Sequence, residues 1–317
     1  MKVLIWGAGG IGCYYGAKLQ TAGNQVVYVA RGEHLAALSD KGLQLSHPEF
    51  SFSGPVNACN EEELIRQHQS SDFDLIIITF KTTSTDQSLQ RLSAWLCSSD
   101  TPVISLQNGV DNEKSIEATL GRERTIGGLA VRIGGHIISP GNVEAKGIAQ
   151  VVYGQWPNNK GYENTVVSQL EKVFAEAGIE AKLSSDIQKE LWRKLMINNS
   201  VNPLSVLTEW DSLRITSHPV YGQVVYKIML ETALAAKLDG VDIQDADVDA
   251  MYDLICNFDA IKTSMLVDYE NGRVLEIDSI SGSVIQRCKE QGEECPLTEL
   301  ISELVKAKAE KRDQNTL

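Results

Sequence analysis

Short apolar runs alternate with stretches of helical periodicity through the first half of the chain. Four runs have the length and β-branched content of strands buried on both faces, at 3–6, 26–30, 75–79 and 103–105. Helices are expected in the periodic stretches between and after them, near 11–21, 35–39, 62–67 and 84–95. Strands that alternate with helices predict a parallel sheet with helices on both faces.

The pattern from residue 125 onward differs, because turn-forming and β-branched residues follow one another without a helix between them. Strands at 125–132, 135–138 and 141–153 predict an antiparallel addition to the sheet. A helix is then expected at 163–177, since a glycine follows it, and a last strand at 179–183.

After Ser184-Ser185-Asp186, a typical helix N-cap sequence, the chain becomes mostly helical. The expected helices lie at 187–200, 220–238, 246–256, 282–291 and 297–309. We therefore place a domain boundary near residue 184, between an α/β half, 1–184, and a helical half, 185–317. The polar tail at 308–317 is expected to be frayed.

Composition narrows the classes of partner. The 317 residues include 29 basic and 42 acidic ones, and the formal net charge of −13 argues against binding to nucleic acid or an anionic membrane. One local group of basic side chains would still suffice for a small anionic substrate. The six cysteines contain no C-x-x-C pair and the five histidines are scattered, so neither disulfides nor a metal site is expected.

The chain shows no sign of membrane insertion or export. No apolar stretch approaches the ~18 residues that cross a bilayer. The N-terminal apolar run breaks at Gly7, too early for a signal peptide. We therefore expect a cytoplasmic protein. An apolar helix face suits a core and a dimer interface equally, so a homodimer stays open.

A glycine-rich turn separates the first predicted strand from the first predicted helix. It consists of Gly7, Ala8, Gly9, Gly10, Ile11 and Gly12. A strand before it, a helix after it and a second strand form the β-α-β context in which a G-x-G-x-x-G pattern binds a dinucleotide. Gly7 would permit the tight turn, Gly9 the approach of a pyrophosphate and Gly12 the close packing of helix on strand. The alternative is a plain strand–helix turn.

Arg31, at the end of the second predicted strand, indicates which dinucleotide binds. An acidic residue there would bind the ribose 2′-hydroxyl of NAD, whereas a guanidinium suits the 2′-phosphate of NADP. We therefore expect NADP(H), with a solvated surface arginine as the alternative. Lys81 and Asn108 follow the next two strands, at the carboxyl edge where open α/β sheets bind ligands, although Asn108-Gly109 is also an ordinary turn sequence.

Lys194, Asn198 and Asn202 recur every four residues, which places them on one face of a helix. Most of their neighbours are apolar, and asparagine is a poor residue for a helix interior because its side chain competes for backbone hydrogen bonds. Two interpretations remain, a polar face turned to solvent and a polar face that binds a ligand in a cleft.

These features, in this order, resemble the ketopantoate reductases (2-dehydropantoate 2-reductases) over nearly the whole chain. The shared elements are the glycine turn with Arg31, Phe80-Lys81, Gln107-Asn108-Gly109, the run 191–204, Thr263-Ser264-Met265, Gly272-Arg273 and Glu276-Ile277-Asp278. The resemblance implies an α/β Rossmann-type N-terminal domain and an all-α C-terminal domain like that of 6-phosphogluconate dehydrogenase, with the active site in the cleft between them.

The resemblance also implies an NADP-dependent oxidoreductase that converts 2-dehydropantoate to (R)-pantoate, a step of pantothenate biosynthesis. At the matching positions, Lys194 would be the general acid and a substrate contact, and Asn198, Asn202 and Ser264 would hold the substrate. One family substrate contact, an asparagine, falls near Ser212, where this chain departs from the pattern.

The remaining implied contacts involve the cofactor. Lys81 would contact it, Asn108 would contact both cofactor and substrate, and Glu276 would contact the cofactor and the active-site groups. An ammonium such as that of Lys194 suits the reduction of a 2-oxo acid, since it stabilises the developing alkoxide and then donates a proton. Glu276 would help to keep it charged, unless Glu276 instead forms a salt bridge with Arg273.

Two other functions remain open. The first is the same fold reducing a different 2-oxo acid with NADPH, which the departure at Ser212 allows. The second is a non-catalytic NADPH-binding regulator, which loss of Lys194 or Glu276 would favour, but both residues are present.

Overall fold

The computed structural model describes residues 1–158 and 165–314 and divides into two compact units. The first comprises Met1–Gln107 and Asn112–Ile187, and the second comprises Asn108–Asp111 and Gln188–Leu317. The segment Asn108–Asp111 thus belongs to the second unit, although the residues on both sides of it belong to the first.

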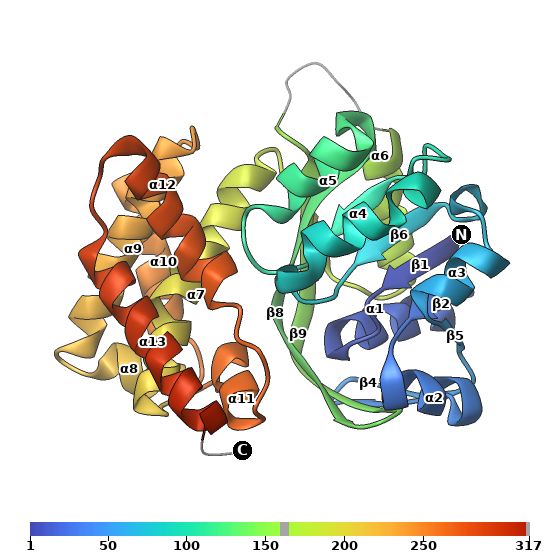
Figure 1. Ribbon diagram of the computed structural model, residues 1–317, viewed down its shortest axis with the longest axis horizontal. Helices are drawn as coiled ribbons and strands as arrows, with labels where there is room; N and C mark the ends of the chain where they lie inside the picture. The colour runs from blue at the N-terminus through green and yellow to red at the C-terminus, as the bar shows by residue number, and fades with distance from the viewer. Residues whose placement is uncertain (159–164, 315–317) are drawn as a thin grey trace. The chain divides into compact units, whose positions relative to one another are not determined.

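The first unit is built on a mixed sheet, which has ten strands in the described residues (Figure 1). The strands are β1 Lys2–Trp6, β2 Gln25–Val29, β3 Leu43–His47, β4 Phe50–Gly54, β5 Asn57–Cys59, β6 Leu75–Ile78, β7 Val103–Ser105, β8 Thr125–Ser139, β9 Asn142–Gln155 and β10 Ala181–Leu183. Their order is β4-β3-β9-β8-β7-β6-β1-β2-β5, with β10 beside β9. The neighbours from β8 to β5 are parallel, and β9 runs antiparallel to β8, as the sequence predicts.

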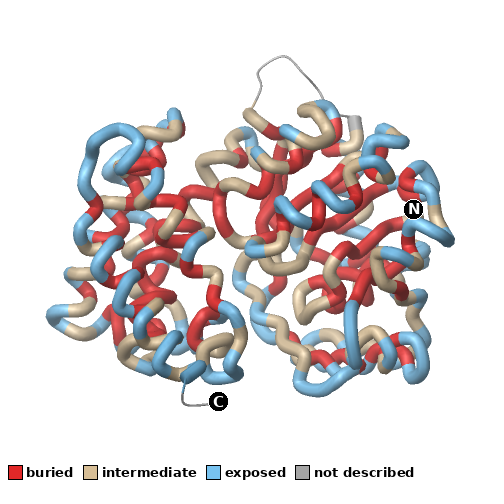
Figure 2. The backbone as a smooth tube through the Cα atoms, viewed as in Figure 1, coloured by how far each residue is buried: buried red, intermediate tan, exposed pale blue. Residues whose placement is uncertain are grey.

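Helices cover both faces of this sheet. They are α1 Gly10–Thr21, α2 Gly32–Lys41, α3 Glu61–Gln67, α4 Thr85–Leu96, α5 Asn112–Leu120 and α6 Thr165–Glu176. Val3 and Ile5 of β1 pack in one apolar cluster with α1 and α6, whereas Leu4 and Trp6 pack in a second cluster with α4 and α5. Figure 2 shows the central strands as buried. Burial on both faces explains why these strands are continuous apolar runs in the sequence.

The predicted break between strands at 125–132 and 135–138 is wrong, because β8 runs unbroken from Thr125 to Ser139. Its pairing with β9 shifts register between Val131 and Ile133, where Arg132 has a φ of 57°. A bulge of this kind tolerates turn-forming residues within a strand, so they do not mark a strand end here.

Periodicity alone misses the hairpin of β3 and β4 and the short strand β5. In β3 and β4 alternate residues are exposed, and serine and glutamine occupy the outward positions. Such half-buried edge strands lack the continuous apolar run that marks β1. The helix predicted at 163–177 corresponds to α6, and its first two predicted residues lie outside the described residues.

The second unit is all-helical. Its helices are α7 Ile187–Thr208, which begins one residue before the unit, α8 Ser212–Ser217, α9 Tyr221–Leu238, α10 Asp245–Cys256, α11 Ser264–Glu270, the π-helical turn η4 Asp278–Gly282, α12 Ser283–Gln291 and α13 Pro296–Gln314. Helix α9 is central, since α8, α10, α12 and α13 all pack against it. The fold is therefore the expected α/β half followed by an all-α half.

Two expectations for this unit are wrong. Helix α7 does not end at residue 200 but continues through Pro203 to Thr208. The tail is not frayed over 308–314, because α13 continues to Gln314 and its last turns are bonded to other helices, while positions 315–317 lie outside the described residues. Lys308 donates to the carbonyl of Val206 (2.8 Å), and Arg312 donates to the carbonyl of Tyr269 (2.8 Å).

Candidate active site

The glycine turn joins β1 to α1 and is tightly packed on the protein side. Gly7 has a φ of 114°, and a Cβ there would overlap the backbone of Phe80. A Cβ at Gly12 would overlap the carbonyl of Gly7, so only glycine allows α1 this close to β1. A Cβ at Gly9 would meet no described atom within 4 Å. The backbone of Gly9 is therefore the part of the turn that a ligand can approach.

Residues distant in sequence hold this turn in place. The Thr79 hydroxyl donates to the Gly7 carbonyl (2.7 Å), and the Ala8 amide donates to the Val29 carbonyl at the end of β2 (2.7 Å). Gly10 lies against the backbone of Gly135 in β8, so neither position has room for a side chain. Sequence analysis missed Thr79 and Gly135, although a glycine inside a strand often marks a close backbone approach.

The N-terminus of α1 suits an anion. The helix has twelve residues and begins at Gly10 with no side chain capping its first turn and no acidic residue in that turn. The first amides of a helix have no partner within it, and they carry the positive end of the helix dipole. Together with the open side of Gly9, they form a cradle for a phosphate group.

Arg31 is the N-cap residue of α2, two positions after the last residue of β2, and its side chain is exposed. It forms no hydrogen bond or ion pair with the described residues. The next turn carries His34, whose Nδ1 accepts from the Gly141 amide (3.1 Å) and whose Nε2 lies 3.8 Å from the Cys13 sulfur. Burial lowers the pKa of His34, and a hydrogen bond with the Ala8 carbonyl opposes that shift. His34 therefore links the start of α2 to the glycine turn, which no local pattern indicates.

The ends of β6 and β7 lie side by side, with Ile78 opposite Ser105. Gln107, only 5% exposed, donates to the Phe80 carbonyl (2.8 Å) and accepts from the Ser105 hydroxyl (3.1 Å). This buried amide joins the two strand ends from which Lys81 and Asn108 follow. Lys81 is half-buried and precedes the turn Thr82–Ser84.

Within the second unit, the structure brings together two of the predicted residues. Asn108, in the segment Asn108–Asp111, donates to Glu276 Oε2 (3.2 Å). Glu276 directly precedes the helical turn that leads into η4, and π-helical turns are frequent at functional sites. Arg273 forms its ion pair with Asp268 (3.5 Å), so the pairing considered as the alternative role of Glu276 is absent from the described contacts.

Lys194, Asn198 and Asn202 all lie on α7, because this helix continues beyond residue 200. The side chains of Asn198 and Asn202 form no hydrogen bond with the described residues, although Asn202 is only 5% exposed. Their neighbour Asn199 differs, since it donates to the Thr232 hydroxyl (2.9 Å) and accepts from the Ser281 hydroxyl (2.7 Å). The polar atoms of the Asn198 and Asn202 amides remain accessible, so a ligand or water can satisfy them.

Ser264 is the first residue of α11 and is exposed. A chain of buried hydroxyls connects this helix to α7. The Ser205 hydroxyl donates to the Asn202 carbonyl (2.7 Å) and lies 2.5 Å from the Thr263 hydroxyl, which caps α11 by accepting from the Leu266 amide (3.2 Å). The turn that carries Asn202 is thus bonded to the turn that carries Ser264.

The Ser212 side chain is buried and hydrogen-bonded within the protein. It is 1% exposed, and its hydroxyl accepts from the Ile261 amide (3.2 Å) and donates to the Asp259 carbonyl (3.3 Å). In the described residues no group of three His, Cys, Asp or Glu side chains is arranged to hold a metal ion. Nor does any helix among them have the length and hydropathy to cross a membrane.

Comparison with known proteins agrees with this arrangement. The family model "Ketopantoate reductase PanE/ApbA" matches residues 3–158, and "Ketopantoate reductase PanE/ApbA C terminal" matches residues 186–309. The 2-dehydropantoate 2-reductase of Pyrococcus horikoshii is 30% identical over 308 residues, which cover 97% of each chain.

Two solved structures have the same fold over nearly their whole length. The 2-dehydropantoate 2-reductase of Geobacter metallireducens has a TM-score of 0.86 at 28% identity, over 97% of this chain and 99% of that one. D-mandelate dehydrogenase, solved with NADH and anilino(oxo)acetate, has a TM-score of 0.89 at 25% identity, over 98% and 99%.

An α/β unit with a glycine turn between its first strand and first helix, followed by an all-helical unit, is the fold of the oxidoreductases matched above. The family models and the sequence relatives then identify the family within this class. The chain belongs to the ketopantoate reductase family.

Proposed function

We propose that this protein reduces a 2-oxo acid to the 2-hydroxy acid with NADPH, and that its substrate is 2-dehydropantoate, giving (R)-pantoate for pantothenate biosynthesis. The observation that carries the proposal is the polar face of α7. Asn198 and Asn202 share that face with Lys194, and their amides have no partner among the described residues, whereas Asn199 is bonded within the core. A small carboxylate would satisfy such amides.

The first unit fits a nicotinamide dinucleotide. Its pyrophosphate would lie over Gly9 at the uncapped N-terminus of α1, where Gly10, Ile11 and Gly12 offer backbone amides. The bound cofactor would supply the hydride for the carbonyl carbon. Lys81 would contact it from the end of β6.

Arg31 supports the phosphorylated form of this cofactor. An exposed guanidinium without an acidic partner among the described residues can form two charge-assisted hydrogen bonds with a 2′-phosphate. The relative solved with NADH shows that the family also includes a protein that binds the unphosphorylated form. We propose NADPH for this chain on the strength of Arg31.

The second unit would supply the proton and hold the substrate. Lys194 would stabilise the negative charge that develops on the carbonyl oxygen and donate a proton to it. Asn198, Asn202 and Ser264 would bind the substrate through neutral donors. Asn108 would contact cofactor and substrate, and Glu276, to which Asn108 donates, would orient the polar groups around the reacting carbonyl.

A second candidate is the same reaction on a 2-oxo acid with another side chain. The similarity to D-mandelate dehydrogenase favours it, since mandelate is a 2-hydroxy acid with an aromatic substituent. The hydroxyl of buried Ser212 is hydrogen-bonded to the loop between α10 and α11, so other residues would recognise the substrate side chain.

Steady-state oxidation of NADPH and NADH with a panel of 2-oxo acids tests the proposal. The panel should include 2-dehydropantoate, phenylglyoxylate, pyruvate and 2-oxoisovalerate. A kcat/KM for 2-dehydropantoate at least about 10-fold above the others supports the proposed substrate. A preference for phenylglyoxylate would replace it with the second candidate, and no turnover of any 2-oxo acid would refute the reductase function.

A further inference from the structure

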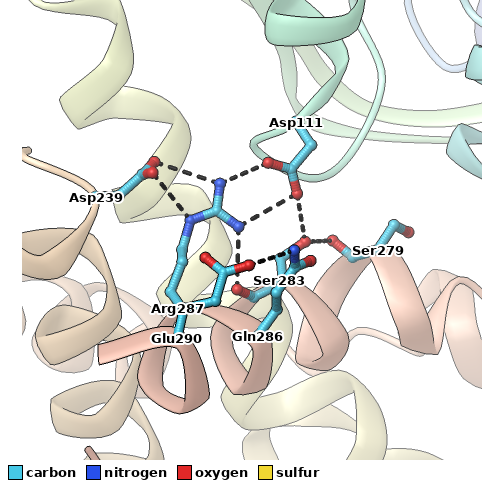
Figure 3. Close-up of polar contacts among 7 residues, drawn as sticks. All are labelled: Asp111, Asp239, Ser279, Ser283, Gln286, Arg287 and Glu290. Atoms are coloured by element: carbon cyan, nitrogen blue, oxygen red, sulfur yellow. Dashed lines mark hydrogen bonds and ion pairs between the residues drawn. The ribbon is translucent and has the colours of Figure 1, made fainter. Parts of the chain in front are cut away.

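Arg287, on α12, is one of the few buried charged residues of the second unit, with 8% exposure. Its guanidinium lies between two carboxylates (Figure 3). The Asp111 carboxylate lies 2.5 Å from Nη2 and 3.4 Å from Nη1 of Arg287. The Asp239 carboxylate lies 3.2 Å from Nε and 3.3 Å from Nη2. The two hydrogen bonds to Asp111 fix the orientation of that pair. Asp239 accepts one hydrogen bond, from Nη2, because Nε forms an ion pair with Asp239 but no hydrogen bond with the described residues.

Except for Asp239 at the end of α9, the contacts of Arg287 reach segments that carry or adjoin candidate active-site residues. Asp111 is in the segment with Asn108. The guanidinium carbon lies 5.1 Å from the ring centre of Trp192, which precedes Lys194 by two positions on α7. The third element is α12 itself, which continues from η4 and hence from Glu276.

Hydrogen bonds extend this connection toward Glu276. The Ser283 hydroxyl lies 2.8 Å from Asp111 Oδ2 and 2.9 Å from the carbonyl of Ser279, and these two acceptors share its single proton. The Ser279 hydroxyl in turn donates to the carbonyl of Glu276 (3.1 Å). Asp111 is thus held by the same turns that carry Glu276, the residue to which Asn108 donates.

The segment Asn108–Asp111 depends on these contacts for its place in the second unit. Its four residues have no secondary structure of their own, and Gly109 has a φ of 94°. A short segment without a regular hydrogen-bond ladder takes its conformation from its side-chain bonds. The Arg287 side chain is 9% exposed and that of Asp111 is 43% exposed. Loss of the Asp111 carboxylate would leave the guanidinium with Asp239 as its acidic partner and would remove the contacts between Arg287 and the segment, which would then shift.

We propose that Arg287 is a positioning residue, which through Asp111 holds Asn108 in its hydrogen bond with Glu276. The proposal rests on the proposed function, because Asn108 and Glu276 matter to catalysis only if the reductase assignment is correct. Arg287 itself touches neither substrate nor cofactor in this role.

Asp111→Asn and Asp239→Asn form a matched pair for the test, because each removes one carboxylate from Arg287 but only Asp111 lies on the segment with Asn108. We expect Asp111→Asn to lower kcat/KM for the 2-oxo acid about 10- to 100-fold, as for a small misplacement of a catalytic group. Asp239→Asn should keep kcat/KM within about 3-fold of wild type. Equal losses in the two variants, in step with their melting temperatures, would show a purely structural role and overturn the proposal.

A double-mutant cycle tests whether the effect passes through Asn108. In an Asn108→Ala background, Asp111→Asn should cause less than about 3-fold further loss, because the residue that it positions is gone. Full additivity of the two losses would contradict the proposal.

Hydrogen exchange separates this proposal from the reductase assignment. In the intact chain, the amides of residues 108–111 should exchange faster in Asp111→Asn than in Asp239→Asn, whatever the substrate is. If the wild type reduces no 2-oxo acid but this difference is present, the assignment fails and the positioning contact stands. Equal exchange in the two variants refutes the positioning contact independently of activity.

Discussion

The three asparagines of α7 lie within five residues of one helix, but their side chains have different hydrogen-bond partners. Asn199 is 1% exposed and bonded to Thr232 and Ser281, which satisfies both ends of its amide within the core. Asn202 is almost as buried but has no such bond within the described residues. The sequence places Lys194, Asn198 and Asn202 on one face of a helix. The structure adds that the side chain of Asn199 is hydrogen-bonded within the core, unlike those of Asn198 and Asn202 in the described residues.

Substitution of Lys194 tests the proposed general acid. Lys194→Ala should lower kcat by about 10²- to 10⁴-fold, the usual range for a group that transfers a proton in the transition state. The dissociation constant of NADPH, measured by fluorescence titration, should change by less than about 2-fold, since the cofactor is assigned to the other unit. Lys189→Ala on the same helix removes an ion pair with Asp247 and serves as the control. Near-normal turnover of Lys194→Ala would exclude this role.

Arg31 determines the expected cofactor preference. Arg31→Ala should lower kcat/KM for NADPH by about 10- to 100-fold, because charge-assisted hydrogen bonds contribute about 1.5–3 kcal/mol. Activity with NADH should remain nearly unchanged, since NADH has no 2′-phosphate. Arg66→Ala, an exposed arginine of the same unit, should alter neither value. If the wild type already used both cofactors equally, the assignment to NADPH would be wrong.

His34 should make the stability of the first unit depend on pH. Burial lowers its pKa below the ordinary 6.5, so as the pH falls the unfolded chain binds a proton before the folded one does. The contribution of His34 is therefore fully present above pH 6.5 and is lost as the pH falls through the lowered pKa. The melting temperature should drop more between pH 7.5 and 5.5 in wild type than in His34→Gln. Parallel drops in the two proteins would show that folding does not lower the pKa of His34.

At the scale of elements, the β1–α1–β2 arrangement is predicted correctly from the sequence, whereas the contacts that support it from distant elements are not. The glycine turn is recognisable because β1, α1 and β2 are adjacent in the chain. The supports of this turn, Thr79 and His34, come from other elements and carry no local pattern. For the same reason α7 is predicted too short, since proline is a helix breaker in isolation but here lies within a packed helix.

The hydroxyl chain between α7 and α11 offers a test at this scale. Thr263→Ala removes the cap of α11 and its contact with Ser205, which should cost about 1 kcal/mol of stability and displace Ser264. We expect a several-fold rise in KM for the 2-oxo acid with an unchanged KM for NADPH. Thr263→Ser retains the hydroxyl and should restore the wild-type value. Equal KM values for Thr263→Ala and Thr263→Ser would argue against coupling through the hydroxyl.

At the scale of the whole molecule, helix α13 is hydrogen-bonded to α7 and α11, the two helices that carry proposed substrate contacts. Lys308 donates to the carbonyls of Val206 (2.8 Å) and Leu207 (3.3 Å) near the end of α7, and Arg312 donates to the carbonyl of Tyr269 (2.8 Å) in α11. The composition of the tail predicts fraying, because a polar sequence alone does not reveal that its side chains cap other helices.

Lys308→Met should therefore lower the free energy of unfolding by about 1–3 kcal/mol, the cost of leaving buried carbonyls unsatisfied. Denaturation by urea measures the change. Lys311→Met, an exposed lysine of the same helix, is the matched control and should lie within about 0.5 kcal/mol of wild type. If the two variants were equally stable, the tail would contribute nothing to the fold.

The four residues Asn108–Asp111 have a consequence for how this protein can be recombined. These residues belong to the second unit, but in the sequence they lie between two segments of the first. Division of the chain at a single position therefore cannot separate the two units. A chimaera that exchanges only 188–317 with a relative would pair Arg287 of one parent with the residue at position 111 of the other. Exchange of the helical half as a working module therefore has to include these four residues as a second graft.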